Sequence, residues 1–150
     1  MADHVITDVA ALEALYGTPG KASIIKVADH LTPLYAKWIM ASRLCVVSTI
    51  GPEGTDGSPR GDDCPVVQLG DPKTLLLPDW RGNNRIDTLR NIVADGRVSL
   101  MFMVPGSNNV IRVNGTAVVS VDPALLDRFD QKGRQPRSVV VITVAEVYSQ

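Results

Sequence analysis

The sequence has very few of the side chains on which most hydrolytic and metal chemistry depends. Only two histidines occur in 150 residues, and both of them, His4 and His30, lie near the N-terminus. A hydrolase or a metal centre built on histidine therefore has little material here. The carboxylates of Asp62 and Asp63 have no second acidic cluster beside them, so we expect no metal site.

Cysteine and net charge are also scarce. Cys45 and Cys64 are too far apart to form a close metal-binding pair, and both lie in apolar or strand-like surroundings, which predicts two buried free thiols. Fifteen basic residues balance sixteen acidic ones, giving a net charge of -1. This balance argues against nucleic-acid or membrane partners attracted by bulk charge.

Long hydrophobic runs are absent too. No stretch approaches the roughly 18 apolar residues that a membrane span requires. The N-terminus lacks a basic segment followed by an apolar core, so it does not predict a signal peptide. We therefore expect a cytoplasmic protein with no membrane partner.

The length of the chain and the order of its helical and β-rich segments predict one mainly β domain over residues 1–150. It has a helical extension over residues 1–42 and a barrel over residues 43–147. Helices are expected over 8–15 and from Thr32 to Ala41, where Thr32 caps the helix and Pro33 takes its first position. Leu34 is expected on its apolar face.

Six β-rich runs follow, bounded by turn formers. They cover residues 43–50, 60–70, 73–79, 97–104, 109–121 and 137–147. Residues 51–59 are dense in glycine and proline and predict a hairpin loop. A helix over 84–94, capped by Asn84, is expected between the third and fourth runs, and another from Asp122 to about Phe129. Turn-linked strands predict antiparallel pairing, and six of them favour a closed or nearly closed barrel.

Residues 78–92 read "PDWRGNNRIDTLRNI" and concentrate arginine and asparagine at a strand-to-helix junction. Backbone N–H groups at a helix start attract anions, and arginine adds a bidentate donor. Arg81, Asn84 and Arg85 are candidates for such a site, and Arg60 reaches it if its strand is a neighbour. The alternative is a solvated turn followed by surface arginines.

Several linked motifs carry a family resemblance: "SPRGD", "LLLPDWRGNNR", "LRNI" and "IRVNGTA". In this order they resemble the pyridoxamine 5'-phosphate oxidase-like family of FMN-binding split barrels, from about Arg43 to Val147. The resemblance implies a six-stranded antiparallel split barrel, and a homodimer with two FMN sites at the subunit interface. The family arginine that begins the second strand matches Arg60, and Gly61 and Asp62 follow it along the flavin.

The resemblance implies two further groups of FMN-binding residues. The end of the family's third strand lines the ring or the ribityl chain and matches Leu77, Pro78 and Asp79. The basic pair that holds the phosphate before the following helix matches Asn84 and Arg85. Together with Arg60, these positions span the same stretch that the residue types identify.

Three departures from the family pattern limit what the resemblance implies. The first member of the basic pair is Asn84, so we expect Arg81 to replace the missing charge. The polar flavin contact of the fifth strand falls on Val110, which has no polar side chain. The C-terminal segment of the vitamin B6 oxidases has no counterpart before Gln150. We therefore expect an FMN-dependent oxidoreductase with another small-molecule substrate; the alternatives are a non-catalytic module that binds flavin, F420 or haem, and a structural dimer.

Overall fold

The computed structural model of the chain describes residues 4–150, so residues 1–3 of the predicted N-terminal extension lie outside it. Seven strands form one sheet in the order β2-β1-β5-β6-β7-β4-β3, and every neighbouring pair is antiparallel. The strands are β1 (Leu44–Gly51), β2 (Gly54–Gly61), β3 (Gln68–Asp71), β4 (Thr74–Asp79), β5 (Arg97–Met103), β6 (Val110–Ser120) and β7 (Ser138–Ser149).

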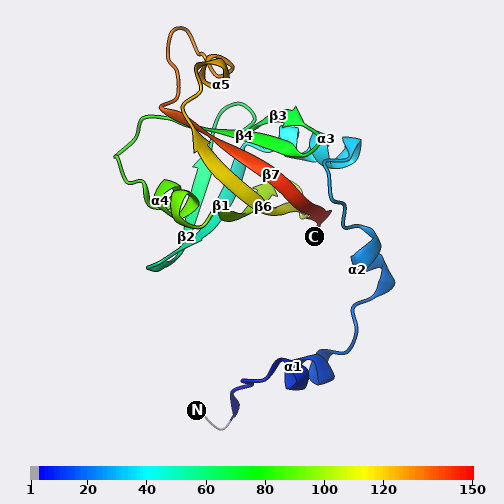
Figure 1. Ribbon diagram of the computed structural model, residues 1–150. Coiled ribbons are helices and arrows are strands. Elements are labelled where there is room, and N and C mark those ends of the chain that lie inside the picture. The colour runs from blue at the N-terminus through cyan, green and yellow to red at the C-terminus, as the bar shows by residue number, and fades with distance from the viewer. Residues whose placement is uncertain (1–3) are drawn as a thin grey trace.

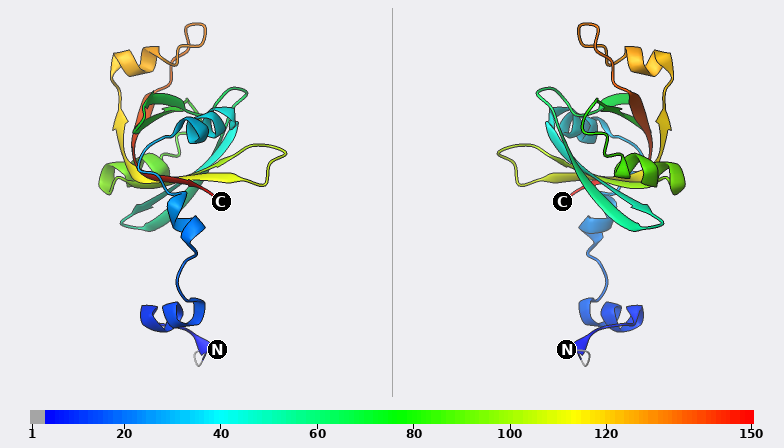
Figure 2. Two further views of the ribbon diagram at one scale, coloured as in Figure 1. Left: turned by 90° about the vertical axis from the view of Figure 1, so that its right-hand side faces the viewer. Right: turned by 90° about the vertical axis from the view of Figure 1, so that its left-hand side faces the viewer.

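The sheet is strongly curved, and its concave side encloses the main core (Figure 1, Figure 2). Side chains alternate between this core and the outer face, because successive residues of a strand point to opposite sides. Val47, Leu100, Phe102, Val113 and Ile142 are almost completely buried inside it. Apolar burial of this kind is the main favourable term in folding, so this alternation sets which way each strand faces.

The described residues form five helices: α1 (Val9–Tyr16), α2 (Lys21–Ile25), α3 (Pro33–Ala41), α4 (Asp87–Ala94) and α5 (Pro123–Asp127). The helix α3 begins as predicted, because the Thr32 hydroxyl accepts a hydrogen bond from the Tyr35 N–H. Tyr35 and Ile39 are buried in the main core, whereas Leu34 faces solvent, contrary to our expectation. None of the helices in this part of the chain is both long and apolar enough to cross a membrane.

The N-terminal segment extends away from the sheet (Figure 1, Figure 2). Neither α1 nor α2 buries a residue. The segment joins the body of the protein at Ala28, whose backbone N–H and C=O both bond to Val147. The predicted helical extension is therefore present, but only its last helix, α3, belongs to the core.

The predicted mainly antiparallel β fold with flanking helices is confirmed, but the prediction of six strands in a closed or nearly closed split barrel differs from the structure in two details. The sheet has seven strands and two free edges, β2 and β3, so it is not closed. The run predicted as one strand over residues 60–70 is divided, because residues 62–67 form a connection between β2 and β3.

The hairpin loop predicted over residues 51–59 was too long, because most of these residues belong to β2. The turn is confined to Pro52 and Glu53, and β2 resumes at Gly54. Its glycines and Pro59 are tolerated because β2 is an edge strand, where a missing N–H breaks no ladder on the free side.

Two glycines let other parts of the chain approach the sheet closely. A Cβ on Gly51 would lie 2.0 Å from Asn91 Oδ1, so the absence of that atom lets α4 pack against β1. A Cβ on Gly115 would lie 2.0 Å from the backbone oxygen of Thr143, at the irregularity in the β6–β7 pairing. The second contact is with backbone and cannot be relieved by a side-chain rotation.

We predict that Gly115→Ala lowers the free energy of unfolding by about 1–3 kcal/mol, because the new methyl group displaces the Thr143 backbone. The matched control is Gly57→Ala in β2, where a Cβ would meet no atom within 4 Å in the described part of the chain. Urea denaturation of both variants measures the difference. Equal stabilities of the two variants would contradict this account of the β6–β7 contact.

Candidate functional site

A cavity of about 550 Å³ lies where β2, the end of β4, the start of β7 and the start of α4 come together. The curvature of the sheet creates this meeting point, because β2 is one edge strand and β4 lies next to the other. The lining residues are Asp56, Gly57, Ser58, Pro59, Arg60, Asp79, Trp80, Gly82, Asn83, Asn84, Arg85, Ile86, Asp87, Thr88, Leu89, Arg137 and Ser138.

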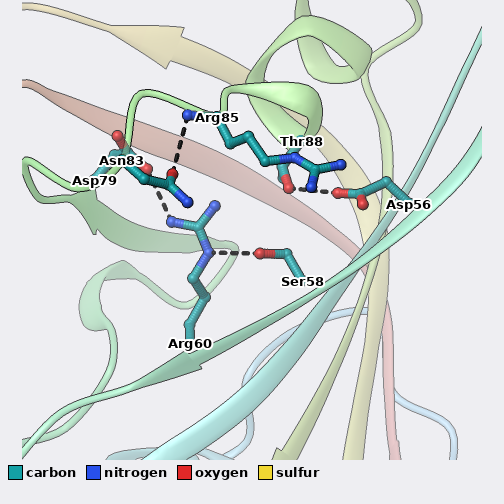
Figure 3. A network of polar contacts seen from close by, with 7 residues as sticks. All are labelled: Asp56, Ser58, Arg60, Asp79, Asn83, Arg85 and Thr88. Carbon is teal, nitrogen blue, oxygen red and sulfur yellow. Dashed lines mark hydrogen bonds and ion pairs between the residues drawn. The ribbon is translucent and has the colours of Figure 1, made fainter.

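Arg60 links the two sides of the cavity (Figure 3). Its Nη1 lies 2.8 Å from Asp79 Oδ1, and its Nε donates to Ser58 Oγ at 3.2 Å. The side chains of Arg60 and Asp79 are only 23% and 19% exposed, so solvent screens this pair less than a surface pair. The ion pair holds β2 against the end of β4, although these strands share no hydrogen-bonded ladder.

The connection from β4 to α4 forms the wall of the cavity that faces β2. Asn83 Oδ1 accepts a hydrogen bond from the Arg85 N–H at 3.0 Å, which closes a tight turn before the helix. Arg85 Nε donates to Asp87 Oδ2 at 3.0 Å, but the Arg85 side chain is 82% exposed. At the first turn of α4, the Thr88 hydroxyl donates to Asp56 Oδ2 at 2.7 Å and so fixes the helix to β2 (Figure 3).

The helix α4 begins three residues later than predicted. Its N-cap position is occupied by Ile86, which supplies no side-chain hydrogen bond, rather than by Asn84. Asn84 has a positive φ of 61°, a left-handed conformation that asparagine tolerates better than most residues. The Asn84 side chain bonds elsewhere, as an acceptor for Arg137.

Arg137 is a member of the cavity wall that the sequence analysis did not single out. Its backbone N–H donates to the Asp79 carbonyl at 2.9 Å, which places it at the start of β7 beside the end of β4. Its Nη1 donates to Asn84 Oδ1 at 3.1 Å. No local motif marks Arg137; only the β4–β7 register, which pairs Asp79 with the neighbouring Ser138, brings it here.

The predicted site residues divide into three groups. Those that line the large cavity are Arg60, Asp79, Asn84 and Arg85. Those that line an adjoining cavity of about 200 Å³ are Gly61, Asp62, Leu77 and Pro78, again with Arg60. Trp80 lies in the walls of both cavities. Arg81 lines neither, so the structure does not bring it together with the other candidates.

The charges that line the large cavity balance. Three arginines, Arg60, Arg85 and Arg137, face three aspartates, Asp56, Asp79 and Asp87. Guanidinium groups bind anions with paired hydrogen bonds, while ionised carboxylates accept hydrogen bonds from hydroxyl and N–H groups. Such a lining suits a ligand that carries both an anionic group and several hydrogen-bond donors.

The two cysteines differ from the prediction in one case. Cys45 is buried as expected, and burial raises the pKa of its thiol to about 12, although the nearby Arg60 opposes that shift. Cys64 is exposed, contrary to the prediction, because it lies in the connection between β2 and β3. Desolvation, followed by the neighbouring Asp62, raises the pKa of the Cys64 thiol.

Comparison with known proteins gives a family and a fold. The family model for pyridoxamine 5'-phosphate oxidase matches residues 31–150. No curated protein sequence matches the chain significantly.

Three solved structures share the fold. HupZ of Group A Streptococcus is 20% identical, with 79% of this chain and 92% of its own covered and a TM-score of 0.65. An FMN-binding protein from Syntrophomonas wolfei is 10% identical, with coverages of 94% and 95% and a TM-score of 0.55. The FAD binding protein from Mycobacterium smegmatis is 12% identical, with coverages of 82% and 97% and a TM-score of 0.54.

We predict that Asp79→Ala lowers the free energy of unfolding by about 1–2 kcal/mol, between the values typical of exposed and of buried ion pairs. The variant leaves Arg60 without its carboxylate in a partly buried place. The double variant Arg60→Ala/Asp79→Ala should lose less than the sum of the two single changes, because the two residues interact directly. Additive losses in a double-mutant cycle would show that the pair does not join β2 to β4.

Proposed function

The chain belongs to the pyridoxamine 5'-phosphate oxidase family, and we propose that it is an FMN-dependent oxidoreductase with a small-molecule substrate. The observation that carries this proposal is the mixed lining of the large cavity, in which arginines alternate with carboxylates. FMN presents a phosphate to the arginines, and its ribityl hydroxyls can donate hydrogen bonds to the carboxylates. Structural neighbours that bind FMN or FAD support the same cofactor class.

In the proposed complex, the phosphate lies beside Arg85 at the start of α4. The positive end of the helix favours an anion there. Arg60 contributes from β2, and Asp79 accepts hydrogen bonds from the ribityl chain. The adjoining cavity, with Gly61, Asp62, Leu77 and Pro78 in its wall, receives the part of the flavin beyond the ribityl chain.

FMN, when bound, supplies the electron transfer, and the protein supplies binding, orientation and electrostatics. This division of labour agrees with the composition of the site, because no histidine lines either cavity in residues 4–150. Trp80 lies in the walls of both cavities and offers an aromatic surface to a ligand that occupies them.

Absorbance of the purified protein tests the proposed function. We expect the two bands of an oxidised flavin after incubation with FMN and gel filtration, and bleaching of the visible band when NADH or NADPH is added without oxygen. A protein that keeps FMN but is reduced by neither donor would be a flavin-binding module. A protein that retains no flavin would contradict the proposal.

We predict that Arg85→Ala weakens FMN binding about ten- to a hundredfold, the effect of losing one charge-assisted hydrogen bond. The fold should remain intact, because an exposed arginine contributes little to stability. Arg90→Ala is the matched control, since Arg90 lies within α4 and does not line the large cavity. Unchanged FMN affinity in Arg85→Ala, measured by quenching of flavin fluorescence, would contradict the phosphate assignment and favour the solvated-turn alternative.

We further propose that the protein is a homodimer, formed through the outer face of β1, β5, β6 and β7. Leu44 and Met101 are 41% and 39% exposed on this face. Arg112 lies beside Met101 in the β5–β6 register, 5.1 Å from the centre of the Tyr148 ring. Arg112 Nε is buried and has no hydrogen-bond partner within the described chain. Arg112 Nη1 donates to Gln150 Oε1 at 3.0 Å, and the remaining charge on this half-apolar face suits a covering partner that carries a carboxylate.

A second copy is the partner that the charges favour. In the next row of the same face, Asn114 Nδ2 donates to Glu146 Oε1 at 2.6 Å, which places one carboxylate close to Arg112. If the twofold axis passes between Arg112 and Glu146, each of them faces the other residue of the second copy, because the same surface faces itself. A groove on the outer face shares Asp56 and Gly57 with the large cavity, so the proposed FMN sites lie next to this interface.

We predict that Arg112→Glu and Glu146→Arg each weaken the dimer, because each single change sets like charges against one another. The double variant should restore the dimer, and light scattering at micromolar concentration measures all three. A monomeric natural protein, or single variants that remain dimeric, would contradict this interface.

A further inference from the structure

The three arginines and three aspartates of the large cavity give no net charge, but the arginines are not equally paired with carboxylates. Two of its three arginines already have a carboxylate partner, since Arg60 is 2.8 Å from Asp79 and Arg85 is 3.0 Å from Asp87. The third, Arg137, donates to the neutral side chain of Asn84, and no carboxylate lies within ion-pair distance of it among residues 4–150.

We propose that Arg137 binds the phosphate of a phosphate monoester at this site alongside Arg85, and that it contributes to specificity because it has no competing carboxylate. The inference rests on the proposed function, and it assigns to the start of β7 a role that the sequence analysis gave to Arg81. The ligand group is a phosphate at the end of a polyhydroxyl chain. Arg137 makes the site prefer a ligand that ends in this phosphate over one that ends in an uncharged hydroxyl.

The position of Arg137 is fixed from two sides. Its backbone N–H bonds to the Asp79 carbonyl, and the next residue, Ser138, is buried in β7. Its side chain is held by Asn84 through one Nη1 hydrogen bond. A guanidinium has five N–H donors, so the others remain available to an anion. The arginine is therefore held in place before the ligand arrives, which reduces the entropy lost on binding.

Arg60 and Arg85 are each already paired with a carboxylate, so they attract a phosphate less strongly than an unpaired arginine does. Arg60 is held by a partly buried ion pair, and a phosphate that recruits it must compete with Asp79. Arg85 and Arg137 are both exposed, but Arg85 is paired with Asp87, so its charge is partly compensated. Arg137 has only an amide partner, and a neutral oxygen does not cancel its charge as a carboxylate would.

The geometry of Asn84 supports this assignment. Asn84 adopts a left-handed backbone conformation, which directs its side chain away from the cap of α4 and leaves its Oδ1 to accept from Arg137. The pair thus joins the β4–α4 connection to the start of β7 in the lining of the cavity. Arg81 lies on the same connection but outside the lining.

The experiment compares FMN with riboflavin, which has the same ring and ribityl chain but no phosphate. Dissociation constants for both are measured by quenching of flavin fluorescence in the natural protein and in Arg137→Ala, Arg137→Lys, Arg81→Ala and Arg134→Ala. Arg134 is an exposed arginine on the same loop as Arg137 and does not line the cavity, so it controls for charge nearby.

We expect Arg137→Ala to weaken FMN binding about ten- to a hundredfold while riboflavin affinity stays unchanged. Arg137→Lys should keep part of the preference for FMN, because it retains the charge without the bidentate geometry. Neither Arg81→Ala nor Arg134→Ala should alter the ratio of the two affinities.

Three results would overturn the inference. Unchanged FMN affinity in Arg137→Ala would show that the charge is not used. An equal loss for FMN and riboflavin would show that Arg137 only shapes the cavity through Asn84. A natural protein that binds neither flavin would overturn the proposed function itself and this inference with it, whereas the first two results leave the proposed function standing.

Discussion

The ion pair between Arg60 and Asp79 is the contact on which the shape of the site depends. An open sheet has two free edges, and in this fold β2 lies at one edge while β4 lies beside the other. The 2.8 Å contact joins them without a backbone ladder. Because the pair is mostly shielded from water, it holds the curved sheet in a shape that leaves a cavity between β2 and α4 rather than a continuous barrel wall.

The cavity gains its chemistry from elements far apart in the sequence. The strand β2 contributes Arg60, the start of α4 contributes Arg85 and Thr88, and the start of β7 contributes Arg137. Close packing of α4 on β1, which Gly51 permits, sets the distance of the helix start from β2. The balanced charges mean that selectivity comes from arrangement rather than from net positive potential, which agrees with a chain whose overall charge is near zero.

The sequence predicted helices and strands well where a local interaction, such as a helix cap or a β-rich run, determines the element. Thr32 caps α3 as expected, and five of the six β-rich runs correspond to the strands β1, β4, β5, β6 and β7. The prediction was wrong where tertiary position overrides local preference, since an edge strand accepts the glycines and Pro59 that suggested a loop. Arg60 and Arg85 stood out by residue type and spacing. Arg137 did not, because it is 53 residues from Asn84 and meets it only through the β4–β7 pairing.

A crystal structure of the protein with FMN tests the central claim most directly, namely that this cavity holds the flavin phosphate. The account predicts the phosphate at the start of α4, within hydrogen-bond distance of Arg85 and Arg137, with the ribityl chain passing Asp79. FMN bound on another surface, or in this cavity with its phosphate turned away from both arginines, would contradict it.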